Sequence, residues 1–170
     1  IDCFVAPCSE QGCPIHQDIP SYLELVGQGR YDEALGVILE KNPLPFITGT
    51  ICTHRCQSAC TRNFYEEPVQ IRAAKLVAAE RGLKVNLGRL RAGAARDEKV
   101  AVIGGGPAGM AAAFLLARAG AKPVIFEKRD ALGGIVKHVI PAFRISDEAI
   151  ENDIKLLEKL GVEVRLNTEV

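Results

Sequence analysis

Apolar side chains recur at intervals of three and four residues in several stretches of the chain, and this spacing predicts amphipathic helices. The predicted helices begin at Asp18-Ile19-Pro20, cover residues 31–41, 69–81 and 107–119, and run from a Ser146 cap to Leu160. Each ends at residues that interrupt helices, namely Gly27 and Gly29, Asn42-Pro43-Leu44-Pro45, Gly82, Gly120, and Gly161. The first half of the chain is therefore expected to be all-helical.

Strand signals appear only in the second half. Val100-Ala101-Val102-Ile103 and Val124-Ile125-Phe126 are short uninterrupted apolar runs, and residues 162–166 alternate between apolar and charged side chains. A predicted helix separates each strand from the next. The order strand, helix, strand, helix, strand predicts a parallel sheet with right-handed crossovers, so the chain is of the α/β class overall.

The two halves also differ in chemistry. All six cysteines lie in the first 60 residues, whereas the glycine-rich signals begin only at Lys99. We expect a helical domain over residues 1–88 and an α/β portion over residues 99–170. Residues 89–98, with arginines among glycine and alanine, are expected to form a solvated linker, in preference to an arm that binds phosphate.

Composition and charge exclude several classes of protein. Of 170 residues, 48% are hydrophobic and 25% charged, with 21 basic against 21 acidic side chains, which argues against disorder and against a protein that coats nucleic acid. Residues 100–117 carry no charge and are just long enough to span a membrane, but Gly104-Gly105-Gly106-Pro107 divides them into a strand and a helix. No signal peptide is visible, and the natural start is expected upstream of Ile1. We expect a cytoplasmic protein without nucleic-acid or membrane partners.

The cysteines form two regular groups. Cys3, Cys8 and Cys13 recur every five residues, and Cys52, Cys56 and Cys60 recur every four, which on a helix would place them on one side. A disulfide scaffold, structural zinc and iron–sulfur clusters are the alternatives. Clusters are favoured because thiolates are their usual ligands, and because proline follows the last cysteine of many cluster motifs, as in Cys13-Pro14. Six cysteines are two short of two [4Fe–4S] clusters, so His16 and His54 are weighed as substitute ligands, although such histidines are more often surface or capping residues.

The glycines indicate a dinucleotide. Gly104-x-Gly106-x-x-Gly109 follows a predicted strand and opens a helix, where a pyrophosphate can meet free backbone N–H groups. Glu127 closes the next strand, where a carboxylate accepts hydrogen bonds from ribose, which favours FAD or NAD(H) over NADP(H). A glycine turn without ligand, and an ordinary loop at Gly133-Gly134, are the structural alternatives. The predicted cofactor-binding residues are Gly104, Gly105, Gly106, Pro107, Ala108, Gly109, Glu127, Lys128, Gly133 and Gly134.

Taken together, these motifs resemble the glutamate synthase small-subunit family, which includes the N-terminal region of dihydropyrimidine dehydrogenase. The motifs are Cys8…Cys13-Pro14…Asp18-Ile19-Pro20, Asn42-Pro43-Leu44-Pro45, Cys52…Cys56…Cys60, Val69-Gln70-Ile71, residues 102–109, and Ile140-Pro141-Ala142-Phe143-Arg144. The amino-acid sequences of residues 61–65 and 133–137 are most similar to those of the branch of selenate reductase iron–sulfur flavoprotein subunits.

The resemblance implies two [4Fe–4S] clusters in the helical domain and, beside it, a two-lobed module that binds FAD and NADPH, with electrons passing from NADPH through FAD to the clusters. By position, Cys3, Cys8 and Cys60 would hold one cluster, whose fourth cysteine is expected three residues before Cys3. The other cluster would be held by Cys13, Cys52 and Cys56.

Two departures from the family pattern concern this second cluster. The family often completes it with Gln or Glu six residues beyond the first residue of Val69-Gln70-Ile71, and here that place is Lys75, whose ammonium group is no iron ligand. The gap from Cys8 to Cys13 is also one residue longer than in glutamate synthase.

The sequence thus predicts the N-terminal fragment of an NAD(P)H-dependent iron–sulfur flavoprotein oxidoreductase, without an acid, base or nucleophile of its own and inactive alone. The rest of the FAD module and the NADPH lobe are expected beyond Val170. Its partners are that C-terminal part and another redox subunit or domain. The rival hypotheses are a docking module with structural clusters and a zinc-stabilised FAD-binding domain.

Overall fold

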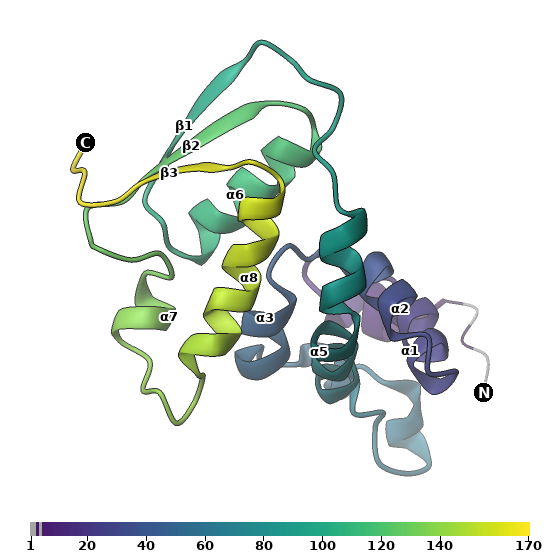
Figure 1. Cartoon of the computed structure of the whole chain (residues 1–170). Helices are drawn as coiled ribbons and strands as arrows, with labels where there is room; N and C mark the ends of the chain where they lie inside the picture. The colour runs from purple at the N-terminus through teal and green to yellow at the C-terminus, as the bar shows by residue number, and fades with distance from the viewer. Residues whose placement is uncertain (1–2, 4) are drawn as a thin grey trace. The chain divides into compact units, whose positions relative to one another are not determined.

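The computed structural model describes Cys3 and residues 5–170, and its internal contacts divide the chain into two units, residues 1–86 and 87–170 (Figure 1). The described part of the first unit is helical, and the second contains a parallel sheet with helices. This mixed α/β organisation confirms the predicted fold class. No helix among the described residues is both long and apolar enough to span a membrane.

The first unit is built from short helices joined by tight turns. They are η1 (Cys8–Gly12), α1 (Ile19–Gly27), α2 (Tyr31–Leu39), α3 (Pro45–Ile51), α4 (Arg55–Ser58), η2 (Thr61–Phe64) and α5 (Ile71–Arg89). Asp18 starts α1 as predicted, since its Oδ1 atom accepts a hydrogen bond of 3.2 Å from the backbone N–H of Ser21. Pro45 both follows the end of α2 and begins α3, a helix that the sequence did not predict.

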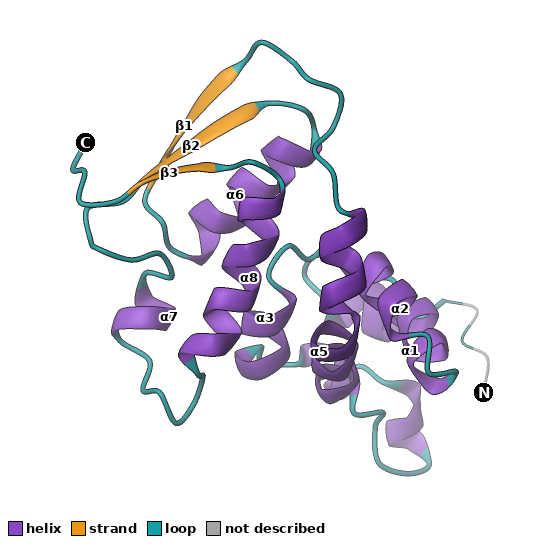
Figure 2. Ribbon diagram, viewed as in Figure 1, coloured by secondary structure: helices purple, strands orange, loops and turns teal. Residues whose placement is uncertain are grey.

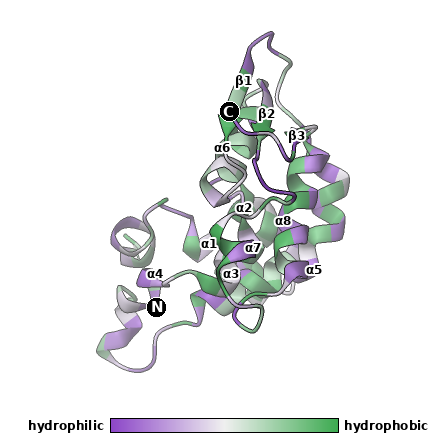
Figure 3. Ribbon diagram, turned by 90° about the vertical axis from the view of Figure 1, so that its left-hand side faces the viewer, coloured by the Kyte–Doolittle hydropathy of each residue, from purple (hydrophilic) through white to green (hydrophobic). Residues whose placement is uncertain are grey.

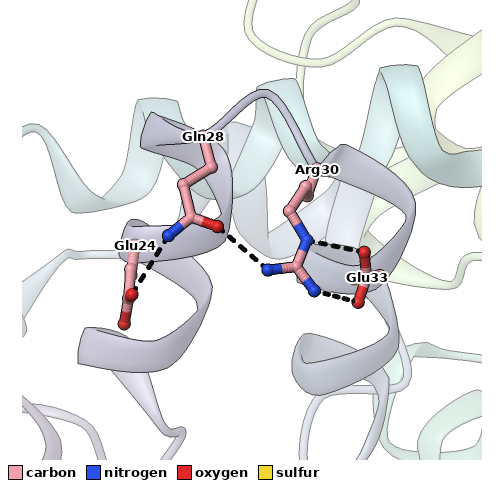
Figure 4. Close-up of polar contacts among 4 residues, drawn as sticks. All are labelled: Glu24, Gln28, Arg30 and Glu33. Carbon is pink, nitrogen blue, oxygen red and sulfur yellow. Dashed lines mark hydrogen bonds and ion pairs between the residues drawn. The ribbon is translucent and has the colours of Figure 1, made fainter.

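Helices α1 and α2 form an antiparallel pair whose buried faces include Ile19 and Tyr22 on one side and Leu35 and Ile38 on the other. At their exposed junction Arg30 donates two hydrogen bonds to Glu33, at 2.7 and 2.6 Å, and a third to Gln28, which in turn contacts Glu24 (Figure 4). Exposed pairs of this kind contribute only about 0.2–1 kcal/mol. The apolar face therefore supplies most of the stability here.

Helix α5 extends beyond its predicted end. The sequence predicted that Gly82 stops it, but the helix continues to Arg89 with Gly82 in its interior. A Cβ atom on Gly82 would lie 2.6 Å from the carbonyl oxygen of Tyr31 and 3.0 Å from Cβ of Leu35. Asn86, one turn on, donates a 2.8 Å hydrogen bond to the carbonyl oxygen of Asp32. The glycine permits close packing against α2, which outweighs its low helix propensity.

The second unit contains three parallel strands in the order β1-β2-β3 (Figure 2). Its elements are β1 (Lys99–Ile103), α6 (Pro107–Arg118), β2 (Lys122–Phe126), α7 (Ile135–His138), α8 (Asp147–Lys159) and β3 (Glu163–Arg165). Ile103 pairs with Phe126, and Phe126 with Arg165, so the strands end at one edge of the sheet. The predicted parallel sheet is confirmed, α7 is additional, and β3 is shorter than predicted.

Helices α6 and α8 supply the core of the second unit. α6 buries Phe114 and Met110 completely, and α8 buries Leu156 and Leu157. Hydrophobic and hydrophilic residues alternate along α8 in Figure 3, as expected of a helix with one buried face. The Oγ atom of Ser146 caps α8 by accepting a hydrogen bond of 3.3 Å from the backbone N–H of Ala149, as predicted.

The segment predicted as a solvated linker is attached to the second unit. The backbone N–H of Gly93 donates to the carbonyl oxygen of Ala117 at 3.0 Å, and that of Arg96 donates to Gly120 at 2.9 Å. Its first residue, Arg89, belongs to α5. Residues 90–98 therefore lie along the C-terminal end of α6 instead of extending freely into solvent.

Candidate functional site

The six cysteines line two separate cavities of the first unit, three in each. A cavity of about 350 Å³ is lined by Cys3, Cys8 and Cys60, and one of about 50 Å³ by Cys13, Cys52 and Cys56. All six side chains are free thiols. The grouping is the one that the family resemblance implied for two clusters.

The second group of cysteines does not lie on one side of a helix, and this prediction from the four-residue spacing was wrong. Cys52 follows the last turn of α3 with extended backbone (ψ 142°), and Cys60 is also extended, so only Cys56 is helical. Between Cys52 and Cys56 the backbone turns through His54 in the left-handed conformation (φ 45°). This turn interrupts the helix between Cys52 and Cys56. Helix α4 then ends at Ser58, before Cys60, which lines the other cavity.

The loop from Cys8 to Cys13 forms a π-helical turn, η1. The Oγ atom of Ser9 accepts a hydrogen bond of 3.2 Å from the backbone N–H of Ile19, which ties this turn to α1. Gly12 packs so closely on α4 that a Cβ atom there would lie 2.6 Å from Cα of Cys56. Turns of the π-helical type are rare and often occur at functional sites.

Helix α5 closes the smaller cavity. The Nη1 atom of Arg72 donates a 3.0 Å hydrogen bond to the carbonyl oxygen of Cys52, and Lys75, one turn on, lines the cavity with only 4% exposure. Burial lowers the pKa of Lys75, while negative charge on Cys52 and Cys56 would raise it. Lys75 therefore carries a positive charge most readily when the neighbouring thiols are ionised.

Burial also acts on the thiols themselves. It raises the pKa of Cys8 in the larger cavity and of Cys56 in the smaller one. A buried thiol stays protonated and unreactive until a metal displaces its proton. Both cavities thus hold thiols whose ionisation would accompany metal binding.

Within the part of the chain that the structure describes, no three His, Cys, Asp or Glu side chains converge closely enough to hold one metal ion. A zinc ion needs its sulfur ligands about 2.3 Å from a single point. In a cubane cluster each thiolate binds a different iron, so the sulfur atoms are further apart. Each cavity is lined by three cysteines, and thiolates are the usual ligands of iron–sulfur clusters, so the residues present fit such clusters.

The glycine-rich turn of the second unit joins β1 to α6. Gly104 has φ +95°, a conformation that glycine adopts readily, and its N–H donates to the carbonyl oxygen of Phe126 at 2.8 Å. A Cβ atom on Gly109 would overlap the carbonyl oxygen of Gly104, so the helix can approach the strand only with glycine there. At Gly106 the nearest atom to such a Cβ is Cα of Gly134, at 3.8 Å, which leaves open space at the start of α6.

Glu127 fixes this turn. Its Oε2 atom accepts a hydrogen bond of 2.6 Å from the N–H of Gly105, and Oε1 accepts one of 2.9 Å from the N–H of Arg129. Both hydrogen bonds lower the pKa of the Glu127 carboxyl group, and the bond from Arg129 has the larger effect. Each oxygen retains acceptor capacity, so the predicted contact with ribose is compatible with this structural role.

The Gly133-Gly134 loop lies directly against the glycine-rich turn. The N–H of Gly133 donates to the carbonyl oxygen of Gly105 at 2.8 Å, and a Cβ atom on Gly134 would come 2.7 Å from Cα of Gly106. The structure thus brings Gly104–Gly106, Glu127 and Gly133–Gly134 together. The other predicted cofactor-binding residues are Pro107, Ala108 and Gly109, which form the first turn of α6, and Lys128. Ala108 and Lys128 are exposed.

One buried polar residue of the cysteine-lined cavities was not predicted from the sequence. Gln17 is 6% exposed, lines the smaller cavity and donates a hydrogen bond of 3.5 Å from Nε2 to Sγ of Cys13. Its position immediately before the Asp18 cap gave no signal, since polar residues are common there. Of the two histidines considered as ligands, His54 lines the cavity and His16 is exposed.

Comparison with known proteins is consistent with the division of the chain into two units. Residues 1–86 match the family described as dihydropyrimidine dehydrogenase domain II, 4Fe-4S cluster, and residues 102–145 match the NAD(P)-binding Rossmann-like domain. Relatives include “Putative oxidoreductase YgfK” of Escherichia coli (strain K12), which is 48% identical over 95% of this chain and 16% of its own length.

Two further relatives are redox subunits by name. The NADP(+)-dependent formate dehydrogenase subunit beta of Moorella thermoacetica is 35% identical over 97% of this chain and 26% of its own length. The Glutamate synthase [NADPH] small chain of Bacillus subtilis (strain 168) is 35% identical over 94% of this chain and 32% of its own length. The chain spans at most about a third of these relatives. It belongs to the dihydropyrimidine dehydrogenase domain II family of 4Fe-4S proteins, which confirms the resemblance.

Proposed function

We propose that this chain is the N-terminal part of a cytoplasmic NAD(P)H-dependent iron–sulfur flavoprotein oxidoreductase, and that it transfers electrons between FAD and two [4Fe–4S] clusters. The observation that carries this proposal is the separation of the six cysteines into two cavities of three. When bound, the clusters and the flavin would supply the redox chemistry, and the chain would position them.

In the first unit the residues that would hold the clusters are Cys3, Cys8 and Cys60 in the larger cavity and Cys13, Cys52 and Cys56 in the smaller. Thr61 supports the first group through a contact of 3.2 Å between its Oγ1 atom and Sγ of Cys3. Hydrogen bonds to the sulfur ligands and limited solvent access are the means by which a protein adjusts the potential of such a cluster.

In the second unit the proposed ligand of the glycine-rich turn is FAD. The pyrophosphate would lie at the N-terminus of α6, where the backbone N–H groups of Ala108 and Gly109 have no carbonyl partner within the helix. Glu127 would accept hydrogen bonds from the ribose, which disfavours a phosphate at that position. The match of residues 102–145 to an NAD(P)-binding domain supports a dinucleotide of this class.

The domain assignment belongs to the same proposal. Residues 1–88 would form the cluster domain, 89–98 the connection, and 99–170 the first portion of the FAD module. A C-terminal part of the same protein would complete the FAD site and bind NADPH. Another redox subunit or domain would exchange electrons with the clusters. Two relatives are named as a subunit beta and a small chain, which indicates that those proteins have further subunits.

The test is reduction of the clusters by nicotinamide cofactor in the complete protein that contains this chain. Protein purified without oxygen should contain iron and acid-labile sulfide in equal amounts, about eight of each for two cubes. Its visible absorption should bleach on addition of NADPH or NADH. Zinc without sulfide would contradict the clusters, and clusters reduced by dithionite but not by nicotinamide would favour a docking module.

A matched pair of variants assigns the two sites. Cys8→Ser should remove the cluster of the larger cavity and leave that of the smaller, and Cys56→Ser should do the reverse. Each variant should lose about half of its iron. Loss of all the iron in either variant would show that the six cysteines do not form two independent sites.

A further inference from the structure

The smaller cavity supplies three thiols, from Cys13, Cys52 and Cys56, whereas a [4Fe–4S] cluster has four irons that each take an external ligand. The residue at the place of the family's fourth ligand is Lys75, and a protonated amine has no lone pair to offer. A further donor is therefore required if the cluster is to be fully ligated.

Gln17 brings a carboxamide group into this cavity, and only 6% of the residue is exposed. Its Nε2 atom already donates a hydrogen bond to Sγ of Cys13. Its Oε1 atom is the one buried side-chain nitrogen or oxygen without a hydrogen-bond partner among the residues that the structure describes. A buried oxygen without a partner is unfavourable, and in native proteins such an atom is explained by strain, by a redox or catalytic function, or by a bound water or ion.

We propose that the Oε1 atom of Gln17 is the fourth ligand of the cluster held by Cys13, Cys52 and Cys56. This inference rests on the proposed function, because it requires a cluster in the smaller cavity. A carboxamide oxygen carries lone pairs and no proton, so it binds iron without first losing a proton. The Nε2 group of the same side chain continues to donate to Cys13, which orients the amide.

The charges around the cavity agree with a neutral ligand. Three thiolates carry one negative charge less than four, and the buried amine of Lys75 lies in the wall of the same cavity. A neutral oxygen at the fourth iron and a cation beside the cluster both reduce the negative charge that the protein interior must hold.

His54 is the competing ligand. It lines the same cavity, and its backbone N–H donates to Sγ of Cys52 at 3.4 Å. His54 is only half-buried, so water can form hydrogen bonds with the imidazole nitrogens. Gln17 is favoured because its oxygen is buried and has no other partner.

The test compares Gln17→Leu with Gln17→Glu in the complete protein, purified without oxygen. Leucine removes the oxygen at similar volume, and glutamate retains it. One-electron oxidation by ferricyanide should release one Fe²⁺ from the unligated corner in Gln17→Leu, so that a [4Fe–4S]²⁺ cluster becomes [3Fe–4S]⁺. The EPR signal of this three-iron cluster should be at least about tenfold stronger than in the wild type, because a missing ligand exposes one iron. Gln17→Glu should retain the iron.

Matched measurements distinguish the alternatives. Unchanged FAD content and circular dichroism show that Gln17→Leu folds. Nitrogen ENDOR of the dithionite-reduced protein should show no strongly coupled nitrogen, and His54→Ala should not increase the three-iron signal. A strong nitrogen coupling, or a three-iron signal no stronger in Gln17→Leu than in the wild type, overturns the Gln17 assignment alone. Absence of iron and sulfide from the wild-type protein instead overturns the proposed function.

Discussion

The backbone N–H of Gly105 and the Oε2 atom of Glu127 are joined by a hydrogen bond of 2.6 Å across 22 residues of sequence. The bond connects the turn after β1 to the end of β2, and it involves a carboxylate that is 6% exposed. The residue that the sequence assigned to ribose binding therefore also fixes the shape of the loop expected to face the pyrophosphate.

Replacement of Glu127 by Gln should destabilise the second unit and change its dependence on pH. The pKa of Glu127 is lowered in the folded state, so ionisation of Glu127 contributes stability above the unfolded pKa of about 4.3, and this contribution is lost as the pH falls through the folded value. Glutamine leaves one N–H without its acceptor, and hydrogen bonds to charged groups contribute about 1.5–3 kcal/mol.

Urea denaturation of wild type and Glu127→Gln across the acid range measures this effect. The difference in the free energy of unfolding should be largest near neutral pH and should shrink toward low pH. A difference independent of pH would show that ionisation of Glu127 contributes nothing to folding.

Gly106→Val should abolish FAD retention while leaving the fold largely intact. Gly106 has extended backbone that any residue can adopt, and its Cβ position meets only Cα of Gly134 at 3.8 Å. The protein therefore tolerates a side chain that a pyrophosphate would not. Gly109→Val is the contrasting variant, since its side chain would overlap the carbonyl oxygen of Gly104 and disturb the fold itself.

Flavin content and thermal unfolding of the two variants in the complete protein provide the measurement. Gly106→Val should lack FAD and keep a melting temperature near that of the FAD-free wild type. Gly109→Val should lack FAD and also have a lower melting temperature. Stoichiometric FAD in Gly106→Val would place the flavin elsewhere.

A second pair of glycines tests the packing of α5. Gly82→Ala should destabilise the first unit by about 1–3 kcal/mol, because the new Cβ atom would lie 2.6 Å from the carbonyl oxygen of Tyr31. Gly88→Ala, in the same helix, meets nothing within 4 Å and should stabilise it by about 0.5–1 kcal/mol through helix propensity. Chemical denaturation of both variants gives the comparison, and equal effects would refute the packing explanation.

These glycines also show which parts of the fold can be predicted from local sequence. The pattern of apolar residues predicted α1, α2, α6, α8 and the parallel sheet, because local periodicity and capping residues determine those elements. Gly82 was misinterpreted as a helix end because its function depends on Tyr31, which is distant in sequence. Nothing local distinguishes a glycine that ends a helix from one that permits close packing.

The cysteine sites were also predicted only in part from the sequence. Spacing indicated that the cysteines would bind a metal centre, and the family resemblance implied which three would act together. Spacing alone gave the wrong geometry for Cys52, Cys56 and Cys60, because the left-handed backbone of His54 interrupts the helix before Cys56 and α4 ends before Cys60. Gln17 was missed because burial of a polar side chain is a tertiary property that a single sequence does not display.

Lys75→Met should lower the reduction potential of the cluster in the smaller cavity. Lys75 is 4% exposed and lies in the same cavity wall as Cys13, Cys52 and Cys56, so its charge is poorly screened by solvent. A cation near a cluster favours the state with one more electron, and its removal disfavours that state. Lys84→Met, which removes an exposed charge from the same helix, is the control.

Potentiometric titration of the complete protein, followed by EPR of the reduced clusters, measures both variants. Lys75→Met should shift one of the two cluster potentials downward and leave the other unchanged, because only the smaller cavity contains this residue. Lys84→Met should shift neither, since water and salt screen a charge on the surface. An equal shift of both clusters in Lys75→Met would mean that the lysine acts through the net charge of the protein and not from within the cavity.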